Sequence, residues 1–165
     1  MLLDPRGPRF AAWVTSAVFA AVLVTGTAGP LGADIAGWLA LAQAAVFAIT
    51  AYRPQFGPYG LIYRSLLAPR LRPPGELEPA APVRFAQLVG LLFAVVAAIG
   101  YLTGASVLGL AATAAALIAA FLNAAFGLCL GCEAYLLGLR LVRRARPEGV
   151  EEDRANPATL EGVEA

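Results

Sequence analysis

Four runs of apolar residues, each long enough to cross a lipid bilayer, constrain the fold more than any other feature of the chain. They cover about residues 10–28, 33–52, 85–102 and 106–127. A membrane-spanning helix needs about 20 mostly apolar residues, because it rises about 1.5 Å per residue through a hydrocarbon core of about 30 Å. The sequence therefore predicts an all-α integral membrane protein, folded as a four-helix bundle.

The composition agrees with this prediction. Hydrophobic residues make up 59% of the chain and charged residues 14%, whereas soluble domains are nearer half apolar and a quarter charged. A cleaved signal peptide is the competing interpretation of the first run, but three more runs follow it. We expect a membrane domain over residues 1–142, in which a helical extension follows the fourth span, and a disordered tail over residues 143–165.

The positions of the basic residues predict an orientation. All twelve are arginines, and they lie only in the segments 1–9, 53–84 and 140–165. Cytoplasmic segments of membrane proteins carry an excess of basic residues, so we expect both termini and the central loop to be cytoplasmic. We do not interpret these arginines as a phosphate-binding surface, and we expect no nucleic-acid partner.

The central loop contains a short aromatic-rich stretch, residues 59–69, in which Arg64 is the only charged residue. This pattern favours a helix that lies in the membrane interface. The Pro-rich stretch that follows, residues 70–82, is expected to be extended.

A weak internal similarity links the two halves of the chain. Arg9-Phe10-Ala11 and Arg84-Phe85-Ala86 each open an apolar run, and the runs close on Thr25-Gly26 and Thr103-Gly104. The pattern fits two duplicated helical hairpins. Chance similarity in an alanine-rich chain is the alternative, and the sequence leaves both open.

Both cysteines of the chain lie in one C-x-x-C motif, Cys129 and Cys132, directly followed by Glu133. In an intracellular setting such a pair indicates redox or metal chemistry more than a structural staple. The chain has no histidine, which excludes nucleophiles activated by histidine. Two thiolates and one carboxylate leave a zinc site incomplete unless a homo-oligomer pools two pairs. We therefore expect no metal and no cofactor.

The chemistry of the pair depends on the helix that carries it. Residues 107–139 are almost wholly apolar, and as one helix they would measure about 50 Å. The helix therefore either projects beyond the membrane or breaks, with Gly127 and Gly131 as the expected hinges. In a regular helix the two Cβ atoms would be about 5–6 Å apart, too far for a disulfide, so oxidation requires local unwinding that Gly131 makes easier. A break at Gly127 would place Cys129 at a new helix N-terminus, where a thiol is activated.

Each of these residues also has a structural interpretation. Cysteine often packs as a small buried hydrophobe, and the two glycines form a G-x-x-x-G pair suited to close helix packing. Glu133 would then only mark the membrane boundary. Hydrogen bonds between helices are expected of three polar residues within the runs, Gln43, Gln87 and Asn123.

The chain resembles the bacterial membrane proteins catalogued as domain of unknown function 4395. The resemblance extends from Asp4 to about Leu137, and its most specific motif is Phe121-Leu-Asn-Ala-Ala-Phe-Gly-Leu-Cys-Leu-Gly-Cys-Glu133. The supporting motifs are Asp4-Pro-Arg-Gly-Pro-Arg-Phe10, Pro58-Tyr-Gly, the Pro-Arg-Leu-Arg-Pro-Pro run at 69–74, Glu76-Leu-Glu78 and Arg84-Phe-Ala-Gln87. The resemblance implies a small multi-pass protein of the bacterial inner membrane without an established activity. It also implies an association with thioredoxin-like and rhodanese-like proteins.

We therefore expect a cytoplasm-facing thiol–disulfide or persulfide relay that works with a soluble thioredoxin-like or rhodanese-like partner. If the helix breaks at Gly127, Cys129 is the attacking thiol, Cys132 resolves the mixed disulfide, and Glu133 shuttles a proton. Positive charge is expected from the loop arginines Arg64, Arg70 and Arg72. The alternatives are a membrane carrier for sulfur species or small solutes, and a structural membrane scaffold.

Overall fold

The computed structural model describes residues 2–71 and 78–145, which are helical except for short turns and one pair of two-residue strands. These residues form two units that divide after Tyr135. Arg72, the Pro-rich residues 73–77 and residues 146–165 of the predicted tail lie outside the described residues. Residues 143–145, which were assigned to the tail, belong to a helix.

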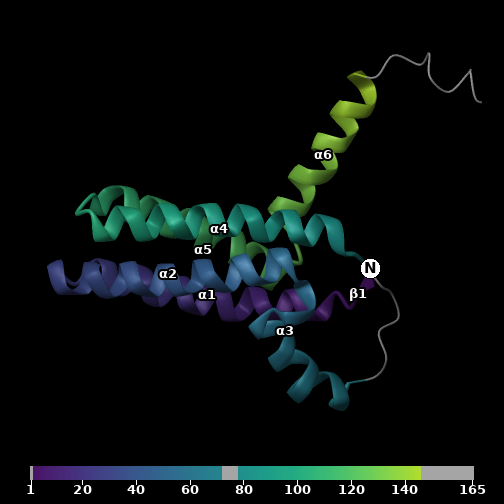
Figure 1. The fold of residues 1–165 in the computed structure, drawn as a ribbon, viewed down its shortest axis with the longest axis horizontal. Helices are drawn as coiled ribbons and strands as arrows, with labels where there is room; N and C mark the ends of the chain where they lie inside the picture. Colours follow the sequence, from purple (N-terminus) through teal and green to yellow (C-terminus); the bar gives the residue numbers. More distant parts are fainter. Residues whose placement is uncertain (1, 72–77, 146–165) are drawn as a thin grey trace, which may run out of the picture. The chain divides into compact units, whose positions relative to one another are not determined.

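Four long helices make up most of the first unit (Figure 1): α1 (Arg6–Gly26), α2 (Pro30–Tyr52), α4 (Ala80–Leu102) and α5 (Ser106–Phe126). In the part of the chain that the structure describes, these four are long and apolar enough to cross a membrane. With 21 to 23 residues each, they measure about 32–35 Å. The prediction of an all-α, four-span membrane protein is confirmed.

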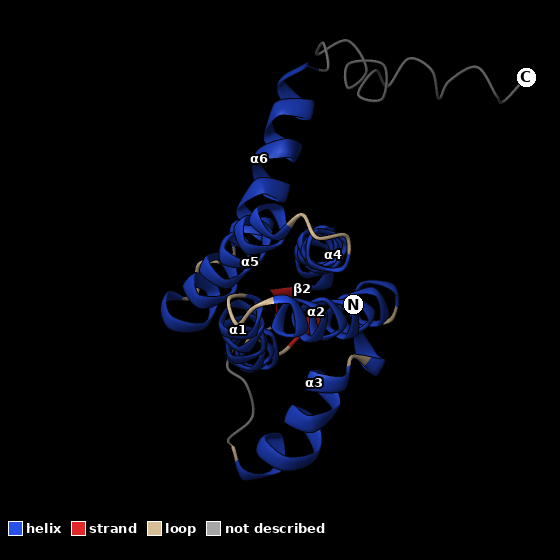
Figure 2. Cartoon of the chain, turned by 90° about the vertical axis from the view of Figure 1, so that its left-hand side faces the viewer, coloured by secondary structure: helices blue, strands red, loops and turns tan. Residues whose placement is uncertain are grey.

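The four helices pack in a closed ring. Helix α1 lies against α2 and α5, and α4 lies against the same two helices from the other side. Figure 2 looks along the helices and shows this arrangement. Successive helices are therefore neighbours, as expected for two hairpins joined by a longer loop.

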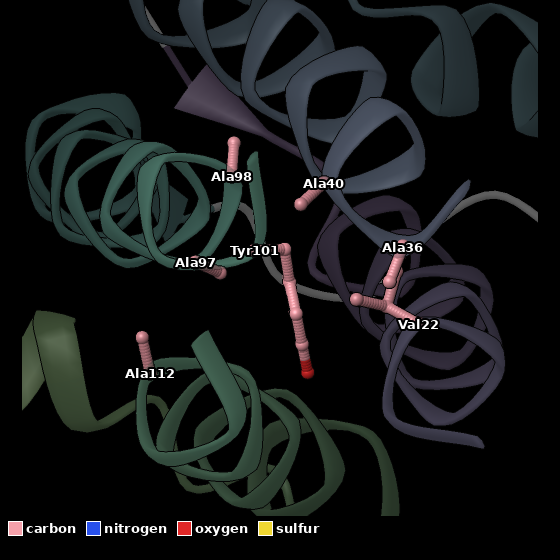
Figure 3. Close-up of a cluster of buried hydrophobic side chains, with 7 residues drawn as sticks. All are labelled: Val22, Ala36, Ala40, Ala97, Ala98, Tyr101 and Ala112. Carbon is pink, nitrogen blue, oxygen red and sulfur yellow. The ribbon is translucent and has the colours of Figure 1, made fainter. Parts of the chain in front are cut away.

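A tyrosine and small residues fill the core at the end of the bundle where the hairpins turn. Tyr101 is only 2% exposed, and its ring points between the helices (Figure 3). A Cβ atom on Gly26 would approach the ring to 2.5 Å, so this glycine leaves the space that the ring occupies. The other members of this cluster are Val22, Ala36, Ala40, Ala97, Ala98 and Ala112. Small residues suit membrane helices, because their association depends on close packing.

The two Thr-Gly pairs of the internal similarity differ in structure. Gly26 is the last residue of α1 and is buried against Tyr101, whereas Gly104 lies in the turn after α4 with φ at +80°. The two glycines therefore have different roles.

A short helical segment connects α2 to α4, as the sequence predicted. It comprises η1 (Pro54–Phe56), α3 (Pro58–Ile62), the π-helical turn η2 (Tyr63–Leu67) and η3 (Ala68–Arg70). The position of this segment in the membrane interface stays a prediction.

Two tyrosine hydroxyls attach the segment to the bundle. Tyr59 donates a hydrogen bond of 2.7 Å to the side-chain oxygen of the buried Gln43. Tyr63 donates one of 3.1 Å to the carboxylate of Asp4, just before α1. Gln43 was expected to bond across the spanning helices, and its partner proves to be the loop segment.

A small strand pair was not predicted. Strand β1 (Leu2–Leu3) pairs antiparallel with β2 (Glu78–Pro79), which directly precedes α4. The pairing brings the start of the chain beside the start of α4. Two-residue strands carry no detectable alternation in sequence, so this contact has no sequence signal.

Candidate functional site

The apolar run that carries the cysteines breaks at Gly127. Helix α5 ends at Phe126, and Gly127 follows with φ at +71°, in the left-handed region that favours glycine. Its N–H donates to the carbonyl of Asn123 at 3.1 Å, and the N–H of Leu128 donates to Leu122 at 3.3 Å. A new helix, α6 (Leu130–Ala145), begins three residues after the break. Of the two geometries that the sequence left open, the structure has the broken one.

Cys129 occupies the position directly before α6. Its carbonyl accepts a 3.0 Å bond from the N–H of Glu133, the first bond of the helical pattern. Its Sγ accepts a 3.3 Å bond from the N–H of Cys132. Ser, Thr, Asp and Asn usually make this side-chain bond at a helix N-terminus, because the first N–H groups of a helix have no partner within it.

Cys129 and Cys132 form a disulfide, with their Cα atoms 5.1 Å apart, within the range of about 4.4–6.8 Å that disulfides show. The local unwinding that the bond requires was expected at Gly131. In the structure the non-helical residue is Cys129, which precedes α6, and its position allows the disulfide to form. Gly131 lies inside the first turn of α6. The predicted hinge at Gly127 is therefore correct, and the one at Gly131 is wrong.

Gly131 has a packing role instead. A Cβ atom on Gly131 would lie 2.6 Å from the Cα of Ala86 in α4, which is too close for any side chain. Nearby, the rings of Phe85 and Tyr135 are in contact, with centroids 5.7 Å apart. The first turns of α6 therefore pack against the beginning of α4. A Cβ atom on Gly127 would meet nothing within 4 Å, so of the G-x-x-x-G pair only Gly131 serves close packing.

The cysteine pair lies at an accessible position. Both cysteines are half-buried, and the neighbouring Leu128 and Leu130 are 51% and 48% exposed. Glu133 is exposed in the first turn of α6, where a negative charge interacts favourably with the helix dipole. The arrangement permits approach by another molecule from outside the bundle.

The remaining predicted site residues are distributed over several contacts. Asn123 contributes its backbone carbonyl to the end of α5. Gln87 is half-buried on α4, directly after Ala86. Gln43 belongs to the contact with Tyr59. The structure thus brings Cys129, Gly131, Cys132 and Glu133 together, and it uses Gln43 elsewhere.

The arginines show a further difference from expectation. Arg64 donates to the carbonyls of Gln55 and Gly60, within its own loop segment. Arg70 is exposed at the end of that segment. The residues that the sequence reasoning missed are Phe85 and Ala86, which support α6. Their motif, Arg84-Phe-Ala-Gln87, was noted in the sequence, but nothing in it indicated a contact with the cysteine region.

These features define a class, a multi-pass membrane protein with a C-x-x-C disulfide at the start of the helix that follows its fourth span. A family model described as Domain of unknown function (DUF4395) matches residues 3–140. The chain belongs to this family, as the resemblance indicated. No curated protein and no solved structure matches the chain.

Proposed function

We propose that Cys129 and Cys132 are a redox-active couple at the cytoplasmic membrane surface, which exchanges electrons or a sulfur atom with a soluble thioredoxin-like or rhodanese-like protein. The observation that carries this proposal is the hydrogen bond from the N–H of Cys132 to the Sγ of Cys129 at the beginning of α6. A sulfur in that position is the one that a helix N-terminus stabilises as a thiolate.

The two cysteines have different roles in this scheme. In the disulfide form the N–H of Cys132 donates to the Sγ of Cys129, and Cys132 lies within the first turn of α6. In our scheme the reduced Cys129 thiolate retains this contact. Thiol–disulfide exchange proceeds by attack of a thiolate on a disulfide sulfur. Cys129 is therefore the attacking residue and Cys132 the resolving one.

The partner reduces the disulfide in two exchange steps. A thiolate of the reduced partner attacks the Sγ of Cys129, and the bond to Cys132 breaks. Cys132 leaves as a thiolate and takes a proton from the solvent, which the neighbouring exposed carboxylate of Glu133 relays. The second thiol of the partner loses its proton and then attacks the partner's own sulfur in the mixed disulfide. This releases Cys129, so the partner dithiol is oxidised and the pair is reduced by two electrons.

Sulfur transfer uses the reduced pair. The Cys129 thiolate attacks the outer sulfur of a partner persulfide, takes over that sulfur, and leaves the partner as a thiolate. The Cys132 thiolate then attacks the Sγ of Cys129 and expels the transferred sulfur as hydrosulfide. The disulfide forms again, and the two electrons have passed from the pair to the sulfur.

The cytoplasmic orientation is supported by the positions of the arginines. Gly131, which lies between the two cysteines, packs against Ala86 at the beginning of α4, two residues after Arg84. Residues 1–9, which precede and open α1, contain two more arginines. Basic residues gather at cytoplasmic ends of membrane helices, so a soluble cytoplasmic protein is the appropriate class of partner.

A redox titration tests the proposal. The purified full chain in detergent is equilibrated with reduced thioredoxin at several ratios, and free thiols are counted from the mass added by a maleimide. We expect a single two-thiol transition under native conditions, and none in the Cys129→Ser, Cys132→Ser double variant. A pair that stays oxidised in the folded protein, but is reduced after unfolding in dodecyl sulfate, would show that the disulfide is structural.

A further inference from the structure

We propose that a groove between α2 and α4 binds an anionic phospholipid, whose phosphate is held by Arg84. The groove has a volume of about 430 Å³. Its lining consists of Ala48, Ala51, Tyr52, Ala81, Arg84, Leu88 and Leu91. Among the lining residues that the structure describes, Arg84 is the only charged one, and the others are apolar apart from the hydroxyl of Tyr52.

The groove is formed by two helices that are long and apolar enough to cross the membrane, so lipid is the molecule that surrounds its open side. Leu88 and Leu91 follow Arg84 at helical spacings of four and seven residues, on one face of α4. Leu88 is 52% exposed. An acyl chain lying along this face would stay in the hydrocarbon region of the bilayer while its headgroup reaches Arg84.

Arg84 lies at the level of a lipid headgroup. Tyr52, the last residue of α2, lines the same groove and is 75% exposed. Tyrosine at the end of a spanning helix is typical of the membrane–water interface. Basic pockets between spanning helices on the cytoplasmic side are known to bind anionic headgroups.

The guanidinium group is held in place for this role. The Nε of Arg84 donates a 2.9 Å hydrogen bond to the carbonyl of Ala51, at the end of α2. This bond uses the Nε of Arg84. In the described part of the chain no other residue bonds the two terminal nitrogens, so both can donate to a phosphate. The planar fork of arginine matches phosphate oxygens in pairs, and a bond that fixes the fork reduces the entropy lost on binding.

The combination of charge and apolar lining favours a phospholipid over a soluble phosphate. Arg84 alone would bind any phosphate weakly in water, because a single exposed ion pair contributes little. The apolar residues of the groove favour a ligand that also carries an acyl chain. This inference does not depend on the chemistry of the cysteines.

The test compares lipid binding to the purified full chain by native mass spectrometry in detergent. Phosphatidylglycerol and phosphatidylcholine with identical acyl chains are the probes. We expect the wild type to prefer phosphatidylglycerol about fivefold, the factor expected for one basic residue at an anionic surface. Arg84→Gln should abolish this preference, and Arg84→Lys should keep most of it. Arg9→Gln, which removes an exposed arginine from the beginning of α1, should leave it unchanged.

A second variant addresses the groove without changing its charge. Ala48→Leu fills the groove and should weaken the binding of both lipids. Ala20→Leu, at an exposed position of α1, should leave the binding of both lipids unchanged. Equal affinity of the wild type for the two lipids, or equal effects of Arg84→Gln and Arg9→Gln, would overturn the proposal. Displacement of phosphatidylglycerol by glycerol phosphate at equal concentration would also overturn it, because the site would then recognise a soluble phosphate.

Discussion

The backbone nitrogen of Cys132 lies 3.3 Å from the Sγ of Cys129 and donates a hydrogen bond to it. One sulfur of the disulfide is thus also the cap of helix α6. The two cysteines are inequivalent for this reason, although they are only three residues apart. The sulfur of Cys129 faces an N–H group of the helix end, and Cys132 supplies that N–H.

The first prediction concerns the reactivity of the reduced thiols. In single-cysteine variants, Cys129 (in Cys132→Ser) should react with iodoacetamide at pH 7 about tenfold faster than Cys132 (in Cys129→Ser), because the helix end favours its thiolate. Mass spectrometry of quenched samples gives both rates. In dodecyl sulfate the difference should vanish. Equal rates in the folded protein would mean that the cap does not activate Cys129.

The second prediction separates the two glycines of the motif. Gly127→Ala should lower the free energy of unfolding by about 1 kcal/mol, because alanine is strained at positive φ. Gly131→Ala should lower the free energy of unfolding by a larger amount, since its Cβ would lie 2.6 Å from the Cα of Ala86. It should also disturb the contact between α6 and α4.

Denaturant titration in mixed micelles, followed by circular dichroism, measures both effects. Gly138→Ala is the matched control, because a Cβ at that position of α6 would meet nothing within 4 Å. This control should leave the free energy of unfolding unchanged or raise it by up to about 1 kcal/mol. If Gly131→Ala behaves like Gly138→Ala, the close approach to α4 is not a feature of the folded protein.

The third prediction concerns pH. Burial of Tyr63, and then its hydrogen bond to the nearby Asp4 carboxylate, raise the pKa of the phenol above its ordinary value of 10.0. The folded state therefore retains a proton that the unfolded state releases. The stabilisation from Tyr63 is complete below pH about 10 and is lost as the pH rises towards the higher pKa of the folded protein.

A comparison with Tyr63→Phe measures this contribution. At pH 8 the variant should be less stable by about 1 kcal/mol, the typical value of one hydrogen bond. Above pH 10 the difference between the two proteins should shrink. Thermal unfolding in detergent at a series of pH values provides the data, and a difference that stays constant across the series would argue against a buried phenol bonded to Asp4.

The spans could be predicted from sequence, and a break at Gly127 could be named as one of two alternatives, because their signals are local. Spanning helices follow from runs of apolar residues, and a glycine near the end of an overlong run indicates a helix end. The contacts of α6 with Phe85 and Ala86 could not be predicted, because they join residues more than 40 positions apart in a chain of 165. The same holds for the bond between Tyr63 and Asp4, which are 59 residues apart.

One prediction from the sequence failed for a specific physical reason. Gly131 lies between the cysteines, and glycine is permissive, so unwinding was assigned to it. The left-handed turn at Gly127 instead ends α5 early enough for Cys129 to precede α6. A glycine can be required for backbone flexibility or for close packing. The close approach of α4, which is visible only in the structure, shows that Gly131 is required for packing.

The fourth prediction concerns orientation. In a background without the native cysteines, Ser65→Cys, which is exposed in η2, should be labelled by a membrane-impermeant maleimide only from the cytoplasmic side. Thr103→Cys, in the exposed turn after α4, should be labelled only from the opposite side. The arginine distribution is the reason. Labelling of both positions from one side would contradict the four-span topology.

Capture of a partner protein by the two cysteine variants tests the redox proposal most directly. A thioredoxin that retains only its attacking cysteine is converted to its mixed disulfide with thionitrobenzoate and mixed with Cys132→Ser or Cys129→Ser. Release of the coloured thionitrobenzoate gives the rate, and a nonreducing gel identifies the adduct. We predict that Cys132→Ser forms the protein–protein disulfide through Cys129 at least about tenfold faster than Cys129→Ser does through Cys132. Equal rates, a faster reaction of Cys132, or no adduct with either variant would contradict the assignment of Cys129 as the attacking thiol.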